Sequence, residues 1–305
     1  MKEHKKGKIF VTGLCGDLGR AIAREGTALG WEVVGINRSP WPDRFPMPEG
    51  VTLHQMSLDD PSQYAPLLEG CDAVIHGAAM HLLNGVGRSL GEFIQANVAN
   101  TANLLECGRA AGIRRFVLCS SMTVVIGEKL HPNGIGVFDE SANVTPNGHY
   151  SMSKVLLERL AAEYARMHDI SVCCLRHMAF GQGKSLDEIN FGLIGLWLSE
   201  RDAARACLLA AEHDLFRGDC FHIGSGAPLS HEDIQKAFCS PWDVLERLYP
   251  GCRAVLEPLG YSPRPSDFHP VACNKKSRRV LRYEPLDSFE AWLRSKGWTP
   301  QQLKP

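Results

Sequence analysis

The sequence predicts an α/β fold built on a doubly wound parallel sheet, with a smaller C-terminal lobe. Two observations predict it. The first half of the chain alternates short apolar runs with runs of helical length, and strands that are buried on both faces have this apolar character. A glycine-rich turn at residues 13–19 joins the first apolar run to the first helical run. After about residue 181 the alternation loosens, which indicates a less regular second part.

The elements of the first part follow from these runs. We expect helices at residues 18–29, 62–69, 90–111 and 150–167, and strands at residues 9–12, 32–36, 51–55, 73–76, 116–120 and 171–175. Asp60-Pro61 is typical of a helix start, because Asp caps free N–H groups and Pro fits the first helical position. Regular strand–helix alternation predicts right-handed crossovers and therefore a parallel sheet.

The second part contains fewer strong signals. We expect a long helix at residues 193–211, a strand at 220–223 and a helix opened by the capping box Ser230-His231-Glu232-Asp233. Residues 240–270 are rich in proline and predict loops with short helices, and residues 287–296 predict a terminal helix.

The composition excludes several classes of partner. The 305 residues carry a formal net charge of -1, which offers no electrostatic attraction for nucleic acid or an anionic membrane. No apolar run approaches the roughly 18 residues of a membrane span, and we expect no signal peptide. The 11 cysteines are scattered without a Cys-x-x-Cys pair or metal-ligand spacing. We therefore expect a cytoplasmic protein with reduced thiols and no metal.

The glycine-rich turn is the first motif that indicates a ligand. Gly13, Gly16 and Gly19 permit a tight turn, a close approach of backbone to phosphate, and close helix–strand packing. The helix that follows offers free N–H groups and a favourable dipole to an anion. The motif predicts a Rossmann domain that binds a dinucleotide over residues 1–180, and residues 181–305 as mainly a substrate-binding lobe interleaved with it.

Tyr150 and Lys154 form the second motif. Residues four apart share one face of a helix. A free Tyr has a pKa of about 10, and a neighbouring cation favours the phenolate and lowers that pKa. Such a Tyr can exchange a proton with an alcohol or a forming alkoxide.

Several motifs together resemble the extended short-chain dehydrogenase/reductase family, the NAD-dependent epimerase/dehydratase group. They are Thr12-Gly13-x-x-Gly16-x-x-Gly19, residues 72–79, 97–106 and 117–121, Tyr150-x-x-x-Lys154, and residues 274–285, where Arg282 replaces the family's glycine. Residues 196–202 are similar to a stretch of uronate dehydrogenases. The arginine with which those enzymes bind the sugar carboxylate is missing from residues 190–196.

The resemblance implies roles for individual residues. Tyr150 is the acid/base, Lys154 holds the nicotinamide ribose and tunes Tyr150, and a hydroxyl at the end of the fifth strand binds the substrate oxygen. Counting forward from Phe116 places that hydroxyl at Ser121, and counting back from Gly127 places it at Met122, which has none. We infer a one-residue insertion and choose Ser121, with Thr123 as the alternative.

Further residues are expected around the two ligands. The expected substrate contacts are His81, Thr123, His149, Arg176 and His177. Arg176, placed just past the sixth strand, could clamp an anionic group or bond loop carbonyls. The expected cofactor contacts are Thr12, Gly13, Cys15, Gly16, Asp17, Leu18, Gly19, Asn37, Arg38, Ser39, Ser57, Leu58, Gly77, Ala78, Ala79, Asn97, Tyr150 and Lys154.

The end of the second strand bears on the choice of cofactor. NAD-binding relatives place an acidic residue there. In this chain Asn37 removes that carboxylate, and Arg38 and Ser39 can bind a phosphate. We therefore predict NADP in preference to NAD, the alternative being that Arg38 is an ordinary surface residue.

The function predicted from these residues is an NAD(P)-dependent oxidoreductase. It would move a hydride between the nicotinamide and a carbonyl or secondary alcohol of a small polar, sugar-like molecule. The alternatives are a nucleotide-sugar epimerase or dehydratase with tightly held NAD, and a non-catalytic nucleotide sensor. A homodimer through the helices at 90–111 and 150–167 is a further expectation from the resemblance. The sequence leaves the substrate and the reaction direction open.

Overall fold

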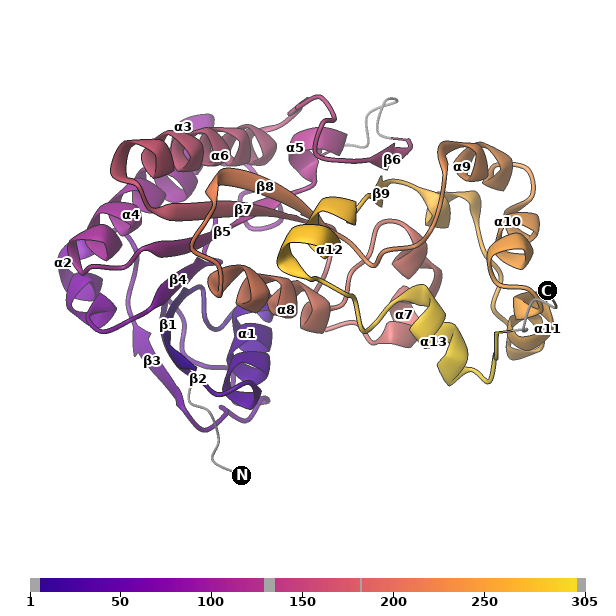
Figure 1. Ribbon diagram of the computed structural model, residues 1–305, viewed down its shortest axis with the longest axis horizontal. Helices are drawn as coiled ribbons and strands as arrows, with labels where there is room; N and C mark the ends of the chain where they lie inside the picture. The colour runs from indigo at the N-terminus through magenta and orange to yellow at the C-terminus, as the bar shows by residue number, and fades with distance from the viewer. Residues whose placement is uncertain (1–5, 129–134, 182, 301–305) are drawn as a thin grey trace.

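The core of the protein is a seven-stranded sheet in which every neighbouring pair of strands is parallel (Figure 1). The computed structural model describes residues 6–128, 135–181 and 183–300. The strand order is β3-β2-β1-β4-β5-β7-β8, which confirms the doubly wound sheet. The strands are β1 (Gly7–Thr12), β2 (Trp31–Asn37), β3 (Val51–Gln55), β4 (Ala73–His76), β5 (Arg115–Ser121), β7 (Ser171–His177) and β8 (Arg217–Ile223).

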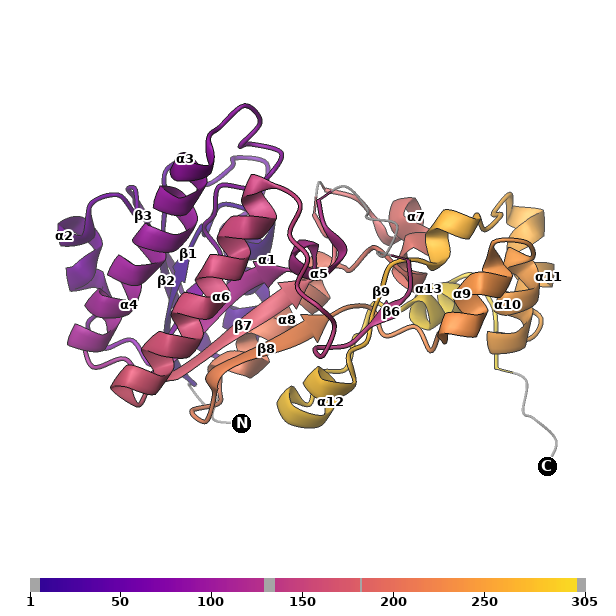
Figure 2. The same ribbon diagram turned by 90° about the horizontal axis from the view of Figure 1, so that it is seen from above.

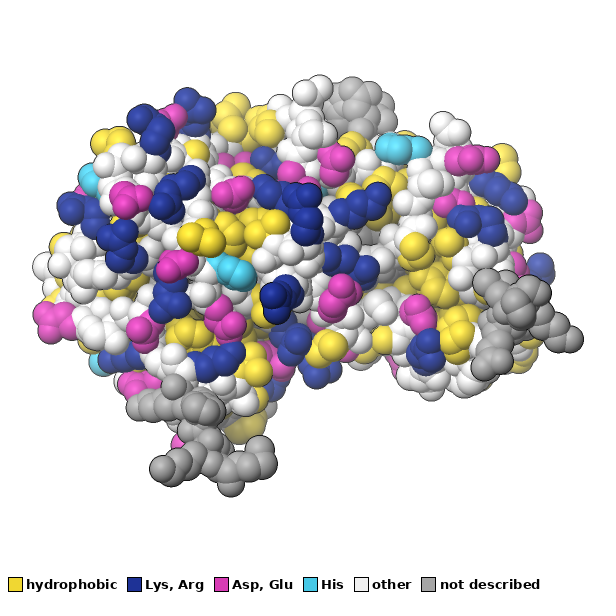
Figure 3. All heavy atoms as spheres, viewed as in Figure 1, with side chains coloured by type: hydrophobic (Ala, Val, Ile, Leu, Met, Phe, Trp, Pro, Cys, Tyr) yellow, Lys and Arg dark blue, Asp and Glu magenta, His cyan; other side chains and the backbone are white. Residues whose placement is uncertain are grey.

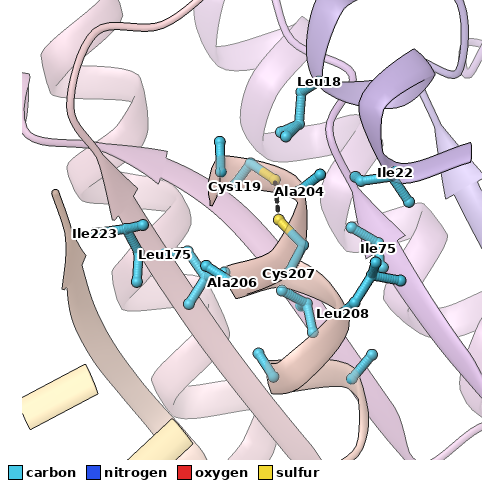
Figure 4. Packing of buried hydrophobic residues seen from close by; sticks show 14 of the residues in the cluster. Leu18, Ile22, Ile75, Cys119, Leu175, Ala204, Ala206, Cys207, Leu208 and Ile223 are labelled. Atoms are coloured by element: carbon cyan, nitrogen blue, oxygen red, sulfur yellow. Dashed lines mark hydrogen bonds between the residues drawn. The ribbon is translucent and has the colours of Figure 1, made fainter. Parts of the chain in front are cut away.

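Helices cover both faces of this sheet (Figures 1 and 2). One face packs against α1 (Asp17–Ala28) and α8 (Glu200–Ala211). The other packs against α2 (Pro61–Tyr64), α4 (Asn100–Ala110) and α6 (His149–His168). In Figure 4, Cys207 of α8 meets Cys119 of β5 among aliphatic side chains, with the two sulfurs 4.0 Å apart.

Several expected elements differ in the structure, among them the helix expected at 62–69, which is α2 followed by a 3₁₀ turn (Ala65–Leu68). The helix expected at 90–111 is helical throughout, but a π-helical turn (Gln95–Ala99) separates α3 (Leu90–Ile94) from α4. The helix expected at 193–211 is wrong in its first part, because residues Asn190–Ile194 form a 3₁₀ turn and α8 begins only at Glu200. Ser199 caps α8 by accepting a hydrogen bond from the N–H of Asp202, and this cap fixes the later start.

The strand expected at 171–175 extends to His177, because β7 pairs with both β5 and β8 along its whole length. Arg176 and His177 therefore lie within the sheet rather than past its edge.

A smaller set of elements forms the C-terminal lobe, with its own apolar core around Phe289 and Trp292. Ser230 caps α9 (His231–Ala237), as the sequence predicts, and Ser288 caps α13 (Phe289–Ser295) within the segment expected to be the terminal helix. A short parallel pair of strands, β6 and β9, was not expected. The elements beyond the main sheet are α5 (Thr123–Ile126), β6 (Val137–Phe138), α7 (Leu186–Ile189), α9 (His231–Ala237), α10 (Pro241–Leu248), α11 (Cys252–Leu256), β9 (Val271–Ala272), α12 (Lys275–Leu281) and α13 (Phe289–Ser295).

The surface carries both signs of charge. Figure 3 shows Lys and Arg interspersed with Asp and Glu over the face viewed. Among the described residues, no helix combines the length and apolar character needed to cross a membrane. The same residues contain no cluster of three or more His, Cys, Asp or Glu side chains suited to a metal ion.

Candidate active site

The glycine-rich turn between β1 and α1 is closely packed. Gly13 has φ +75°, and a Cβ there would lie 2.8 Å from the Ala78 nitrogen. A Cβ on Gly19 would lie 2.3 Å from the Gly13 carbonyl oxygen. Gly16 is the N-cap of α1 and offers no side chain to the first-turn N–H groups. The turn therefore has the close approach and the uncapped donors that suit a phosphate.

A cleft of about 430 Å³ opens beside this turn, at the carboxyl ends of the first strands. Ligands of doubly wound folds bind at this edge. Expected cofactor contacts that line it are Gly13, Gly16, Asn37, Arg38, Ser39, Ser57, Leu58, Gly77, Ala78 and Ala79. Lining residues that the sequence reasoning missed are Ile36, Met56, Asp59, Met80, Asn84, Arg88, Ala96 and Asn100.

Arg38 stands at one side of the cleft. Its backbone carbonyl accepts a hydrogen bond from Gln55 Nε2 at 3.1 Å. Within residues 6–128, 135–181 and 183–300, its guanidinium makes no hydrogen bond or ion pair. Asp59 lies nearby, and hydrogen bonds from Ser57 and Asn100, with a smaller effect of Arg38, lower the pKa of its carboxyl. The cleft thus presents a cation and an anion at this end.

The side chains of two expected cofactor contacts are buried and do not line the cleft. The side chain of Thr12 is fully buried, and its hydroxyl bonds His76 Nδ1 at 2.6 Å and the Ala78 N–H at 3.1 Å. The Asn97 side chain is also buried, and its amide bonds Met80 and Ser153. Both side chains hold neighbouring segments in place instead of facing the cleft.

Other expected contacts lie in the turn or the first turn of α1. The Cys15 thiol donates to the Ser39 carbonyl at 3.5 Å, and Leu18 is buried in the core. Asp17 pairs with Arg20 at 2.6 Å. Because these side chains are engaged, only their backbone N–H groups are suited to a phosphate.

Ser121, Tyr150 and Lys154 meet where β5 ends against α6. The Ser121 hydroxyl accepts hydrogen bonds from the N–H and the hydroxyl of Thr123, at 3.2 and 3.0 Å. The hydroxyl of Ser121 also exerts a lowering effect on the pKa of Tyr150, which places it beside the phenol. The geometry therefore favours Ser121 over Thr123 as the hydroxyl next to Tyr150, with Thr123 supporting it.

Lys154 is buried, and its ammonium donates to the Cys119 carbonyl at 2.7 Å and lies 5.7 Å from the centre of the Tyr150 ring. Burial raises the pKa of Tyr150, against the lowering effect of the Ser121 hydroxyl. This direction differs from the lowering expected from a neighbouring cation. The cause is desolvation, which penalises the phenolate and also lowers the pKa of Lys154. Tyr150 is therefore protonated at neutral pH and able to donate a proton.

The expected substrate contacts divide into two groups. His81 packs its ring edge against Tyr150, with ring centroids 4.8 Å apart, and Thr123 adjoins Ser121. The ring of His149 is instead hydrogen-bonded through Nδ1 to the Arg88 carbonyl oxygen, at 3.2 Å.

The side chains of Arg176 and His177 are both buried within the sheet, where neither lines the cleft. Arg176 is buried and forms a two-pronged ion pair with Glu158, at 2.8 and 2.7 Å. His177 is buried beside Cys207, with Nε2 3.8 Å from the sulfur. Both residues belong to β7. The sequence had placed them beyond the strand because its apolar run ends at residue 175.

Glu128 is a further residue that sequence reasoning missed. Its carboxylate accepts the Ser151 N–H at 2.7 Å, and a Cβ on Gly148 would collide with it. It therefore caps the start of α6 beside Tyr150. The N-cap residue Gly148, which has no side chain to cap α6 itself, was the available signal.

The comparisons with known proteins agree with this geometry. The family model described as "NAD dependent epimerase/dehydratase family" matches residues 9–185, more than half of the chain. A 3 beta-hydroxysteroid dehydrogenase/Delta 5-->4-isomerase of Mycobacterium tuberculosis is 30% identical over 56% of this chain and 46% of its own length. A 2-alkyl-3-oxoalkanoate reductase of Stenotrophomonas maltophilia is 33% identical over 54% of this chain and 49% of its own. The chain thus spans about half the length of these curated relatives.

Solved structures share the fold. A structure titled "Mutated Uronate Dehydrogenase" superposes with a TM-score of 0.66 at 21% identity, covering 98% of this chain and 88% of that one. A UDP-galactose 4-epimerase superposes with a TM-score of 0.63 at 22% identity, covering 94% and 99%. At these identities the likeness concerns the fold alone.

Proposed function

Because the chain belongs to the NAD dependent epimerase/dehydratase family, we propose that it is an NAD(P)-dependent oxidoreductase acting on a small polar carbonyl compound or secondary alcohol. The observation that carries the proposal is the grouping of Ser121, Tyr150 and Lys154. The group is joined to the cleft by His81, which packs against Tyr150 and directly follows the cleft-lining Met80. A bound nicotinamide supplies or accepts the hydride.

The residues then divide the remaining work. Ser121 receives two hydrogen bonds from Thr123 and lies beside the Tyr150 phenol, so its hydroxyl can orient the substrate oxygen where Tyr150 exchanges the proton. Tyr150, protonated because it is buried, donates a proton to that oxygen as a carbonyl is reduced. Lys154 supplies a buried positive charge that stabilises the phenolate left behind. The same steps run in reverse for an alcohol.

A net redox reaction fits better than a nucleotide-sugar epimerase or dehydratase. Substrates of those enzymes carry a diphosphate, which calls for exposed cations. Arg176, the strongest candidate partner for such a diphosphate, is already engaged in an ion pair with Glu158. Lys184 lies 4.0 Å from the Trp197 ring, at a separate small pocket of about 210 Å³. These contacts support a substrate without a nucleotide, and the intact Ser-Tyr-Lys set supports catalysis over sensing.

We propose NADP as the preferred cofactor. Arg38 lines the cleft with a guanidinium that has no hydrogen-bonding partner among the described residues, and Asn37 stands where a carboxylate would repel a phosphate. A guanidinium and the Ser39 hydroxyl are suited to a ribose phosphate. A cytoplasmic location belongs to the same proposal, supported by the largely buried free thiols.

The first experiment titrates cofactor-stripped protein with NADPH and NADH, and then screens small carbonyl compounds for turnover. Tyr150→Phe should lower kcat by about 10²- to 10⁴-fold, the usual contribution of a general acid, with cofactor Kd nearly unchanged. Tyr164→Phe is the matched control, because it removes a phenol of α6 that bonds Arg109 instead. Full turnover by Tyr150→Phe would overturn the assignment. Tight NADH with no net redox would favour the epimerase, and no nucleotide binding would contradict the proposal.

A further inference from the structure

A chain of buried hydrogen bonds links the cofactor cleft to the helix that carries Tyr150. It begins at Ala78, whose N–H donates to Thr12 Oγ1 at 3.1 Å. Thr12 Oγ1 lies 2.6 Å from His76 Nδ1, and His76 Nε2 lies 2.9 Å from Thr101 Oγ1. The Thr101 hydroxyl donates to the Asn97 carbonyl at 2.7 Å. The side chains of Thr12, His76 and Thr101 have at most 2% exposure, so water does not compete for these bonds.

The direction of each bond follows from counting protons. The Thr101 hydroxyl donates its one proton to the Asn97 carbonyl, so it can only accept a hydrogen bond from His76. His76 must therefore carry its proton on Nε2, which leaves Nδ1 as an acceptor for the Thr12 hydroxyl. Only neutral imidazole in this one tautomer satisfies both neighbours.

The chain continues through the π-helical turn into α6. Asn97 sits at the centre of the turn Gln95–Ala99. Its side-chain amide donates to the Met80 carbonyl and to Ser153 Oγ, both at 2.9 Å. The Ser153 hydroxyl donates to the carbonyl of Tyr150 at 2.7 Å. The strand that ends at the cofactor cleft is thus tied to the backbone of the Tyr residue.

We propose that His76 is a positioning residue for the reaction: acting through Thr101, it fixes the π-helical turn and thereby the placement of Tyr150 relative to the cofactor cleft. The proposal rests on the proposed function. Two further observations support it. Burial lowers the pKa of His76 to about 3, so that its imidazole stays neutral. The Asn97 carbonyl lies inside the π-helical turn, a rare element that is frequent at functional sites, and the Thr101 hydroxyl is bonded to it.

Thr101→Val tests the inference, because Val has nearly the shape of Thr and only the hydroxyl is lost. We expect kcat to fall roughly 10- to 100-fold, since small misplacements of catalytic groups cost this much. The cofactor Kd should change less than about threefold, because the Thr12–Ala78 contact that holds the cleft turn remains. Thr101→Ser keeps the hydroxyl and should restore most of kcat. Thr27→Val, which removes a hydroxyl bonded to Ala23 within α1, is the matched control.

A kcat for Thr101→Val within twofold of the parent protein, or equal losses in Thr101→Val and Thr101→Ser, would overturn the inference. A second measurement does not depend on turnover. Nitrogen NMR of the full chain should find His76 with a protonated Nε2 and a bare Nδ1, unchanged between about pH 5 and 8. The opposite tautomer, or titration within that range, would also overturn it. If no substrate is turned over while the tautomer is as expected, the proposed function fails and the hydrogen-bond chain stands.

Discussion

At the scale of single residues, the proposed preference for NADP depends on Arg38, which lines the cleft. The change Arg38→Ala should weaken NADPH binding about 10- to 150-fold, because a charge-assisted hydrogen bond is worth roughly 1.5–3 kcal/mol. NADH lacks the phosphate and should bind as before. Fluorescence titration measures both, with Arg44→Ala as a control on an arginine of the same loop that stacks on Phe45. An equal loss of affinity for NADPH and NADH would mean that Arg38 contacts a part of the cofactor that both nucleotides contain.

Arg282 illustrates a residue held in an unfavourable conformation. It ends α12 with φ +55°, in the left-handed region that glycine adopts freely. Arg282→Gly should therefore raise the free energy of unfolding by about 0.5–1 kcal/mol. Urea denaturation measures it. Arg279→Gly, inside the same helix, should instead lower stability by about 1 kcal/mol. Destabilisation by Arg282→Gly would mean that contacts of the Arg282 side chain stabilise the protein by more than the left-handed backbone conformation destabilises it.

Local spacing predicted the residues whose roles depend on neighbours in the chain. Tyr150 and Lys154 share a helix face, and the glycines at 13, 16 and 19 form one turn. Local spacing did not predict properties that depend on burial, such as a pKa. The raised pKa of Tyr150 comes from desolvation, which depends on elements far apart in the sequence. The bonds of His76 join three such elements, so no local pattern indicated them.

At the scale of elements, α6 is anchored by a buried ion pair on the face that also carries the active site. Glu158 follows Lys154 by one turn and accepts from Arg176 of β7 and from Ser120 of β5, the latter at 2.6 Å. Removing one partner of such a pair leaves a buried charge uncompensated, at a cost of about 3–5 kcal/mol.

Arg176→Met should therefore lower the free energy of unfolding by about that amount, measured by urea denaturation. Adding Glu158→Leu to it should recover much of the loss, because the pair is then replaced by apolar groups. Arg166→Met breaks an exposed pair with Glu163 on the same helix and should change little. A small effect of Arg176→Met alone would show that water reaches Glu158.

Elements with strong periodicity were predicted well, and those that depend on tertiary contacts were not. The apolar runs located the strands of the sheet, and Ser230 and Asp60 marked true helix starts. The expected helix at 193–211 failed because Trp197 pairs with Ala179 in a β-bridge and Ser199 caps α8. The two-residue strands β6 and β9 pair across the sequence and are too short for any periodic signal.

At the scale of the whole molecule, we propose a homodimer through α6 and the helical segment 90–110, which comprises α3, the π-helical turn and α4. Helices α4 and α6 lie on the same face of the sheet (Figure 2). Met152, Leu156 and Met167 of α6 are exposed apolar side chains, and Ile94 and Val98 beside them are half-buried. Ala161 and Ala165 are fully buried and pack toward the sheet instead. The exposed stripe, rather than the alanines, is therefore the proposed contact.

Leu156→Glu should convert the dimer to a monomer, because a carboxylate placed at a two-fold interface meets its own copy. Light scattering after size exclusion measures the mass, which should be twice the chain mass of 33.6 kDa for the parent protein and the chain mass itself for the variant. Leu215→Glu, an equally apolar and more exposed site on the α8–β8 connection, should remain dimeric. A monomeric parent protein, or a dimer that survives Leu156→Glu, would place the interface elsewhere. Because α6 also carries Tyr150 and Lys154, a dimer formed there would hold the catalytic helix of each subunit against its partner, and dissociation by Leu156→Glu should lower thermal stability together with mass.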